Sequence, residues 1–199
     1  MAGTGEGNPT GKFMLIGGVA FIALLVLICG AYLVAAYNGM VSADQDTQSQ
    51  WGKVEVQYQR RVDLIPNMVE IARKQMDFEQ STLTAVTAAR TGWLNAKTVD
   101  EKVAAGSQLD AAMPRFIATL EAYPQLRSSE INAKLMDEVA GTENRISVER
   151  SRYNDVVRAF NVKVKSFPDN MLAPAFGFKE KAYFQSAAGS DQPVKIKFD

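Results

Sequence analysis

The chain opens with an uninterrupted apolar segment. Residues 13–37, FMLIGGVAFIALLVLICGAYLVAAY, contain no charged side chain. A helix of this length extends roughly 37 Å, enough to cross a hydrocarbon core about 30 Å thick. A cleaved signal peptide has a shorter apolar segment, usually about 7 to 15 residues. The pattern therefore predicts an uncleaved transmembrane helix at 13–37, preceded by a disordered segment at 1–12 that is rich in Gly, Thr and Pro.

Beyond this segment the apolar residues recur at every third or fourth position. They do so over 54–86, with an interruption only at Glu79, and again over 99–120 and 131–167. Such spacing places apolar side chains on one face of a helix. The alternation typical of a strand is found only in VKIKF, at 194–198. The soluble part is therefore expected to be helical.

Local signals indicate where these helices bend or end. Pro114 lies inside the second apolar stretch and should bend that helix, because proline lacks an N–H and its ring crowds the preceding turn. The polar residues 91–101, TGWLNAKTVDE, break the pattern around Gly92 and separate the first stretch from the second. Ser128 and Ser129 occupy the N-cap position of the third helix, and Pro168 ends it.

Pro66 poses the main question about the first stretch. A proline in a helix interior costs about 3 kcal/mol unless the chain turns there. The helix either continues through a kink, or turns over 63–65 so that Pro66 is the first residue of a new helix. A single rod over 43–90 would extend about 70 Å and be too long for the second stretch to cover. We therefore favour a corner at Pro66.

These patterns predict an all-α fold, in which an N-terminal transmembrane helix is followed by an antiparallel helical bundle of three to four long helices. The bundle is expected over 38–184, with a C-terminal tail at 185–199.

Charge and composition exclude several classes of function. The 199 residues include 22 basic and 22 acidic side chains, and only Lys12 and Glu6 precede Tyr37. A balanced soluble part exerts no overall attraction on nucleic acid, and we expect no nucleic-acid partner. The chain has no histidine, and its single cysteine, Cys29, lies in the predicted span. Ser-His-Asp triads, Cys-His pairs and the usual zinc ligand sets are excluded, so we expect no catalytic residue, cofactor or metal.

Carboxylates are the remaining candidates for acid–base chemistry. An enzyme would need several of them in one cleft, for example Asp63, Glu143 and Glu149. The alternative is that they form ion pairs on helix surfaces, which suits a sequence dense in Lys and Arg. Arg60 and Arg61 are candidates to pair across the bundle with Glu143 or Glu149, or else face solvent. Arg61 lies beside the apolar stripe and is the better candidate for burial.

The segment FPDNMLAPAFGFKEKAYF at 167–184 is rich in aromatic residues. It is expected to fold onto the bundle as a cap. The alternative is an exposed surface for a protein partner or for lipid.

Several motifs, in order along the chain, resemble the LemA family of membrane-anchored helical proteins. They are YNGMV (37–41), SQWGKVEVQYQRR (49–61), DLIPNMVE (63–70), VTAAR (86–90), EAYPQLR (121–127), TENRIS (142–147), RYNDVVRAFN (152–161) and FPDNMLAPAFGFKEKAYF (167–184). The resemblance implies a bacterial inner-membrane protein with an N-terminal anchor and a four-segment helical bundle. It implies no reaction, although family members are associated with envelope or stress functions and some with magnetosome formation. The region 92–115, with Trp93 and Pro114, departs from the family pattern.

We therefore expect a non-catalytic structural or adaptor protein that forms homo-oligomers or recruits other membrane proteins. The alternatives are an envelope enzyme or enzyme regulator, and a carrier of lipid or small molecules. Flanking charge favours a cytoplasmic N-terminus and a bundle outside the inner membrane. The candidate structural or interaction residues are Arg60, Arg61, Asp63, Pro66, Asn67, Glu143, Arg145, Tyr153, Asn154, Phe176 and Phe178.

Overall fold

A computed structural model describes residues 9–74, 79–127 and 129–185, and the described part is built from helices without strands. The segment VKIKF, for which strand-like alternation was noted, lies outside the described residues. The helices are α1 (Pro9–Arg73), α2 (Gln80–Asn95), α3 (Val99–Glu121), the short 3₁₀ helix η1 (Pro124–Arg127), α4 (Glu130–Lys165) and α5 (Asp169–Leu172).

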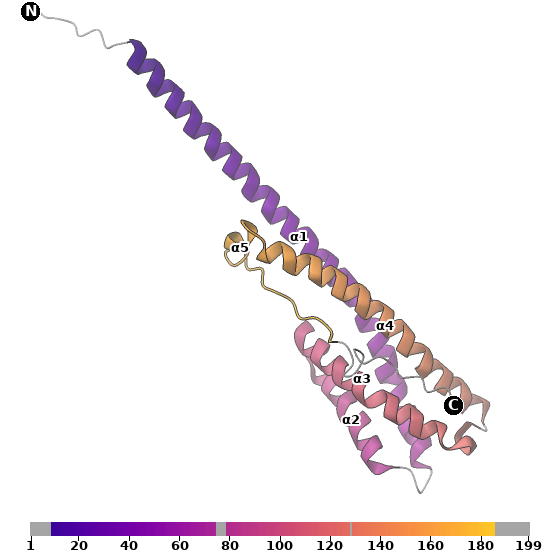
Figure 1. Cartoon of the computed structure of the whole chain (residues 1–199). Coiled ribbons are helices and arrows are strands. Elements are labelled where there is room, and N and C mark those ends of the chain that lie inside the picture. Colours follow the sequence, from indigo (N-terminus) through magenta and orange to yellow (C-terminus); the bar gives the residue numbers. More distant parts are fainter. Residues whose placement is uncertain (1–8, 75–78, 128, 186–199) are drawn as a thin grey trace, which may run out of the picture.

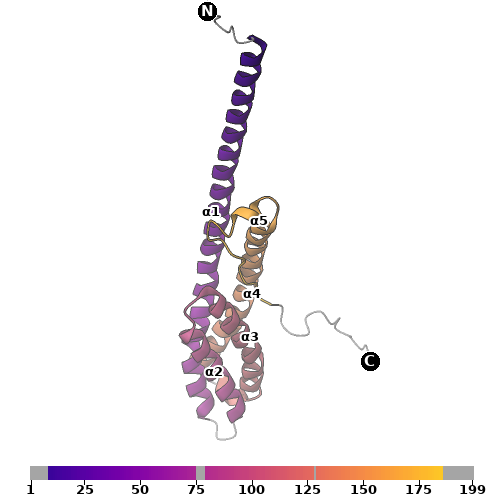
Figure 2. The ribbon, with the colours of Figure 1, turned by 90° about the vertical axis from the view of Figure 1, so that its left-hand side faces the viewer.

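Helix α1 dominates the shape of the molecule. Its 65 residues extend about 97 Å, and only its C-terminal part is covered by other helices (Figure 1). Helix α4 lies antiparallel along this part, and α2 and α3 form a hairpin beside the end of the rod that lies farthest from the N-terminus (Figures 1 and 2). The fold is the expected antiparallel helical bundle, with an apolar helix projecting from it.

The projecting part of α1 carries the predicted transmembrane helix. Every side chain from 14 to 35 is exposed. Of the described helices, α1 is the one that is long and apolar enough to cross a membrane. It begins at Pro9, so residues 9–12, which we expected to be disordered, are helical; residues 1–8 lie outside the described part.

The bundle has two apolar clusters. The larger one joins all four long helices, and α1 contributes a regular series of buried residues to it: Val54, Tyr58, Ile65, Met68 and Ala72. The smaller cluster lies where α1 leaves the bundle and contains Ala36, Met40, Phe160, Val164 and Ala173. The spacing of three and four that was visible in the sequence is therefore the spacing of the core.

The expected corner at Pro66 is wrong. Helix α1 continues through Pro66 and ends at Arg73, and α2 begins at Gln80. Pro66 is exposed while its neighbour Ile65 is buried, so the proline ring lies on the outer face of the helix. The first apolar stretch is divided between α1 and α2, so neither helix alone covers 43–90. Helix α2 begins directly after Glu79, where the apolar pattern was interrupted.

The structure shows how a proline is accommodated inside α1. Proline has no N–H, so the carbonyl four residues earlier, that of Val62, loses its helical donor. The Nε of Arg90 on α2 donates to this oxygen at 3.0 Å. The side chain of Val62 is buried, and an unpaired carbonyl there would be costly. A donor from another helix therefore replaces the missing backbone hydrogen bond.

The remaining helix boundaries follow the sequence signals closely. Pro114 lies inside α3, and Ser129 is the N-cap residue of α4, although its side chain makes no capping hydrogen bond. Helix α2 does not stop at Gly92 but continues to Asn95. The break instead precedes α3, where Thr98 and Glu101 form a capping box.

The effects of substituting Pro66 and Arg90 on the free energy of unfolding should not be independent. We expect Arg90→Ala to lower the free energy of unfolding by about 1 to 3 kcal/mol, because it leaves the Val62 carbonyl unpaired. In a Pro66→Ala background the same substitution should cost clearly less, because the restored backbone N–H of residue 66 can bond to that carbonyl. Thermal unfolding of the four proteins of this cycle, followed by circular dichroism in detergent, measures the difference. Equal costs in both backgrounds would contradict the exchange of donors.

Candidate functional site

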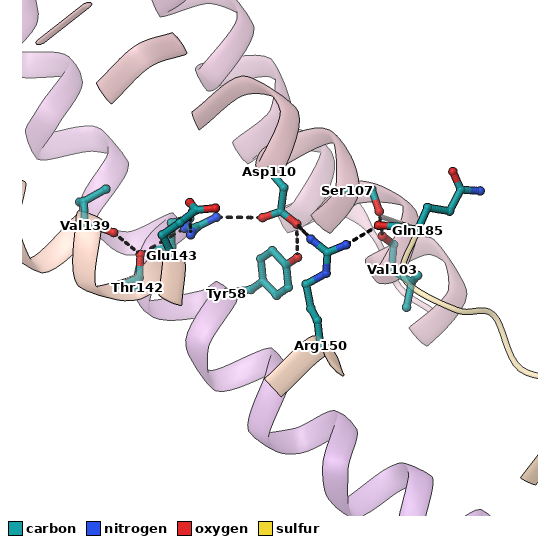
Figure 3. A network of polar contacts seen from close by, with 10 residues as sticks. Tyr58, Val103, Ser107, Asp110, Val139, Thr142, Glu143, Arg150 and Gln185 are labelled. Carbon is teal, nitrogen blue, oxygen red and sulfur yellow. Dashed lines mark hydrogen bonds and ion pairs between the residues drawn. The ribbon is translucent and has the colours of Figure 1, made fainter. Parts of the chain in front are cut away.

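A fully buried arginine lies at the centre of the bundle. The side chain of Arg61 is 0% exposed, and each of its three nitrogens donates a hydrogen bond. Nη1 reaches Asp110 Oδ1 on α3 at 2.8 Å, and Nη2 reaches Glu143 Oε2 on α4 at 2.8 Å. Nε donates to Thr142 Oγ1 at 3.2 Å. One side chain from α1 therefore joins α3 and α4, in the polar network drawn in Figure 3.

Asp110 is the common acceptor of this network. In addition to Arg61, it accepts a bond from the Tyr58 hydroxyl at 2.6 Å and another from Arg150 on α4 (Figure 3). Burial, reinforced by the Asp110 charge and the hydrogen bond to it, raises the pKa of Tyr58 well above its ordinary value. Tyr58 consequently remains a neutral hydrogen-bond donor, and Asp110 remains an acceptor placed between two arginines.

Arg150 extends the network to the end of the described chain. Its Nη2 donates to the backbone carbonyl of Gln185 at 2.5 Å (Figure 3). Its guanidinium carbon also lies 4.9 Å from the centre of the Phe184 ring, in cation–π geometry. We call residues 179–185 the C-terminal strap, because they run back along α4 without forming a helix.

Two asparagines of α4 hold the strap by its backbone. Asn154 donates to the carbonyl of Phe184 and accepts from its N–H, both at 2.9 Å. Asn161 makes the same pair of bonds with Lys181, also at 2.9 Å. The asparagines are seven residues apart and therefore lie on the same face of α4. They satisfy backbone groups that a strap without secondary structure would otherwise leave unpaired.

The strap also completes an aromatic cluster. Phe184 is buried and stacks on Trp51 and Tyr58, with ring centres 6.2 and 5.8 Å apart. Tyr58 stacks in turn on Trp93, at 4.6 Å. Gly106 on α3 makes this packing possible, because a Cβ there would lie 3.0 Å from the Tyr58 ring and 3.2 Å from Phe184. Trp93, which we had set apart as a departure from the family pattern, is therefore part of the core.

Tyr153 packs edge-on against Trp51 and Phe184 in the same cluster. Its hydroxyl is buried and has no hydrogen-bond partner among the described residues. Burial, with a smaller effect of Asp100, raises the pKa of Tyr153 to about 12. Tyr153 is thus a packing residue at neutral pH.

A second group of contacts lies where α1 leaves the bundle. The Tyr37 ring is 5.2 Å from Phe176 in edge-to-face geometry and 6.2 Å from Phe178. The Tyr32 hydroxyl donates to Asp169 Oδ1 at 2.5 Å. The aromatic segment expected to cap the bundle is therefore partly folded onto it, through Phe178 and the buried Phe184, whereas Phe167 is exposed.

The other candidate residues lie nearer the surface. Arg60 was expected to pair with Glu143 or Glu149, but it pairs with Glu138 at 2.7 Å, as Arg145 does at 3.4 Å. That expectation was wrong because Arg60 projects from a different side of α1 than Arg61, toward an earlier turn of α4. Asn67 is exposed, like Pro66 beside it.

The three carboxylates proposed for catalysis do not share a cleft. Asp63 is exposed and accepts from Gln59 on its own helix, whereas Glu143 pairs with Arg61. Glu149 accepts from Gln50 at 2.6 Å and pairs with Arg152 at 2.7 Å. Each has a different partner, so the carboxylate centre suggested by the sequence is not formed.

Sequence reasoning missed four residues that organise the site: Arg90, Asp110, Arg150 and Asn161. Asp110 had a detectable signal, since it lies four residues after Gly106 and three before Met113, on the buried face of α3. Asn161 also had a detectable signal, because it lies seven residues after Asn154 and therefore on the same face of the helix. Arg90 had no local signal, because its acceptor exists only when α1 and α2 pack together.

Taken together, the arrangement is suited to joining helices. Asp110 and Glu143 are occupied by arginines, and the hydroxyl of Thr142 both accepts from Arg61 and donates to the Val139 carbonyl at 2.6 Å. Within the described part of the chain, no group of three or more Cys, Asp or Glu residues is placed to hold a metal ion.

Comparison with known proteins gives consistent matches. The LemA family profile matches residues 50–198. Magnetosome protein MamQ 2 of Paramagnetospirillum magneticum is 26% identical over 94% of this chain and 76% of its own length. Magnetosome protein MamQ of Magnetospirillum gryphiswaldense is 25% identical over 92% of this chain and 76% of its own length. Protein LemA of Metamycoplasma hominis is 26% identical over 90% of this chain and 82% of its own length.

Removing the buried arginine should destabilise the bundle strongly. In Arg61→Ala, Asp110 loses one of its two arginines. We expect the free energy of unfolding to fall by about 3 kcal/mol, because breaking a buried pair costs more than breaking an exposed one. That loss corresponds to a fall of about 6 to 12 °C in the midpoint of thermal unfolding. Arg60→Ala is the matched control, since its pair is exposed and should contribute about 1 kcal/mol or less. Equal midpoints for the two variants would refute the central role of Arg61.

Proposed function

The chain belongs to the LemA family, and on this basis we propose that it is a membrane-anchored, non-catalytic structural or adaptor protein that assembles with itself or recruits partner proteins. One observation carries the proposal. The apolar segment and the first helix of the bundle are a single helix, α1 (Figure 1). A bundle attached by a continuous helix stands at a fixed height above the membrane, as suits a scaffold.

The interior of the bundle supports a structural role. Its buried charges join helices and hold the C-terminal strap. The sequence contains no histidine, and its cysteine lies in the apolar segment. Ion pairs of this kind stabilise one arrangement of helices, and the carboxylates of Asp110 and Glu143 are engaged by arginines.

The relatives support the proposed architecture, but their names do not indicate one shared biological process. Two of those compared carry the name of magnetosome proteins, and another is named only LemA. These proteins align with 90% or more of this chain. The similarity therefore extends over most of the chain, and the proposal is limited to its architecture.

The carrier alternative has weaker support. A pocket of about 460 Å³ lies between the end of α1 and α2. Its lining includes Arg73, Gln80, Thr84, Thr87 and Thr91, all of which are exposed. A groove lined in this way is open to water, whereas a lipid carrier needs an enclosed apolar cavity.

Assembly is directly testable with the full chain. We expect chemical cross-linking in intact cells, followed by detergent extraction and light scattering, to give a mass above that of one chain or a co-purifying protein. Oxidation of Cys29 shows in addition whether two spans approach each other, and Cys29→Ser is its control. A strict monomer that co-purifies with nothing and forms no cross-link would refute the proposal.

We also propose that the N-terminus is cytoplasmic and that the bundle lies outside the inner membrane. Lys12 precedes the apolar segment, and no Lys or Arg follows it until Lys53. In a Cys29→Ser background, Ser129→Cys should react with a membrane-impermeant maleimide in spheroplasts. Thr4→Cys, on the other side of the segment, should react only in inverted vesicles. The opposite labelling pattern would reverse the topology.

A further inference from the structure

We propose that the loop around α5, residues 166–178, is a second membrane contact that lies in the headgroup region of the bilayer and inserts Phe167 and Met171. This inference rests on the proposed membrane span and extends it. It assigns a lipid-binding surface to the folded part of the chain, beside the transmembrane helix.

The first observation is the exposure of large apolar side chains in this loop. Phe167 is 80% exposed and Met171 is 70% exposed. Met171 belongs to α5, and Phe167 precedes it, so both belong to one short segment. The neighbouring Leu172 and Phe178 pack against the smaller apolar cluster, and this anchors the loop to the bundle.

The second observation is the position of the loop along α1. Asp169 accepts the hydrogen bond of Tyr32, and Phe176 packs against Tyr37. Both tyrosines belong to the apolar segment predicted to cross the membrane. The loop is therefore held beside the last turns of the span, at the end of the bundle that faces the N-terminus of α1 (Figure 2).

The geometry of α1 sets the depth of the loop. The exposed apolar stretch from 14 to 35 extends about 33 Å, close to the roughly 30 Å of a hydrocarbon core. When this stretch fills the core, Tyr32 and Tyr37 lie at its boundary, where tyrosine is enriched in membrane proteins. A loop in contact with both then lies at the same boundary.

The chemistry of the loop favours lipid over a charged protein partner. Two ion pairs lie beside it, Lys163 with Asp169 at 3.8 Å and Lys165 with Glu180 at 2.8 Å, and the exposed Lys179 follows it. What the loop presents outward is an aromatic ring and a thioether chain. Because the loop is held against the span, a bilayer that surrounds the span also contacts the loop. Insertion by apolar contact should therefore need no anionic lipid.

Depth-dependent quenching tests the proposal in the full-length protein. Single cysteines are introduced as Phe167→Cys and Met171→Cys in a Cys29→Ser background and labelled with an environment-sensitive fluorophore. The proteins are reconstituted in phosphatidylcholine vesicles. Ile131→Cys is the matched control, because Ile131 is also apolar and 78% exposed but lies at the other end of α4, about 50 Å away.

We expect a blue-shifted emission at 167 and 171, with quenching by lipids spin-labelled near the headgroup, and neither effect at 131. Both effects should persist when the protein is diluted with excess lipid. Vesicle flotation is measured in parallel, so that failure of the span and failure of the loop are distinguished.

Three results would overturn the proposal. Protein that does not float with the vesicles would refute the membrane span and with it the proposed function. Protein that floats, but whose probes at 167 and 171 are no more quenched than the probe at 131, would refute the loop contact alone. A blue shift that disappears on dilution with lipid would assign the loop to contact between copies of the chain instead.

Discussion

The buried guanidinium of Arg61 is the constraint on which the arrangement of the bundle depends. Removing a cation from water costs several kcal/mol, and only close, well-directed partners recover that cost. The planar guanidinium fixes the directions of its donors, so Asp110 and Glu143 must approach at particular positions. This requirement sets the register of α1, α3 and α4 together. Because Asp110 also binds Arg150, and Arg150 binds the strap, the constraint extends to residue 185.

A second constraint keeps α1 continuous. Pro66 would normally end a helix or introduce a corner, and the chain would then have a shorter first helix and a different pairing with α4. The hydrogen bond from Arg90 to the Val62 carbonyl compensates for the missing N–H, and the exposed position of Pro66 gives its ring space. The last turns of α1, from Pro66 to Arg73, consequently continue the rod that begins at Pro9. They carry Met68, Val69 and Ala72 into the main apolar cluster.

Sequence reasoning succeeded where the controlling forces are local. The bounds of α3 and α4 were predictable because the apolar spacing and the proline that follows α4 both act within a few residues. It failed at Pro66 because the compensating donor, Arg90, lies 28 positions from the Val62 carbonyl that it satisfies. It named Glu143 as one of two possible partners of Arg61, which the structure confirms, but it missed Glu138 as the partner of Arg60. The choice between these carboxylates depends on the rotation of α4 about its axis.

The sequence by itself determined the class of the protein: a helical bundle behind an apolar segment, with no histidine and with its one cysteine inside that segment. Those properties follow from composition and periodicity, which do not depend on how helices meet. The tertiary structure alone decided that Pro66 lies within a helix, that Asp110 accepts from two arginines, and that the α5 loop sits beside Tyr32 and Tyr37. Each of these depends on a partner from a distant segment, whose position is fixed only when desolvated charges and unpaired backbone groups must all be satisfied together.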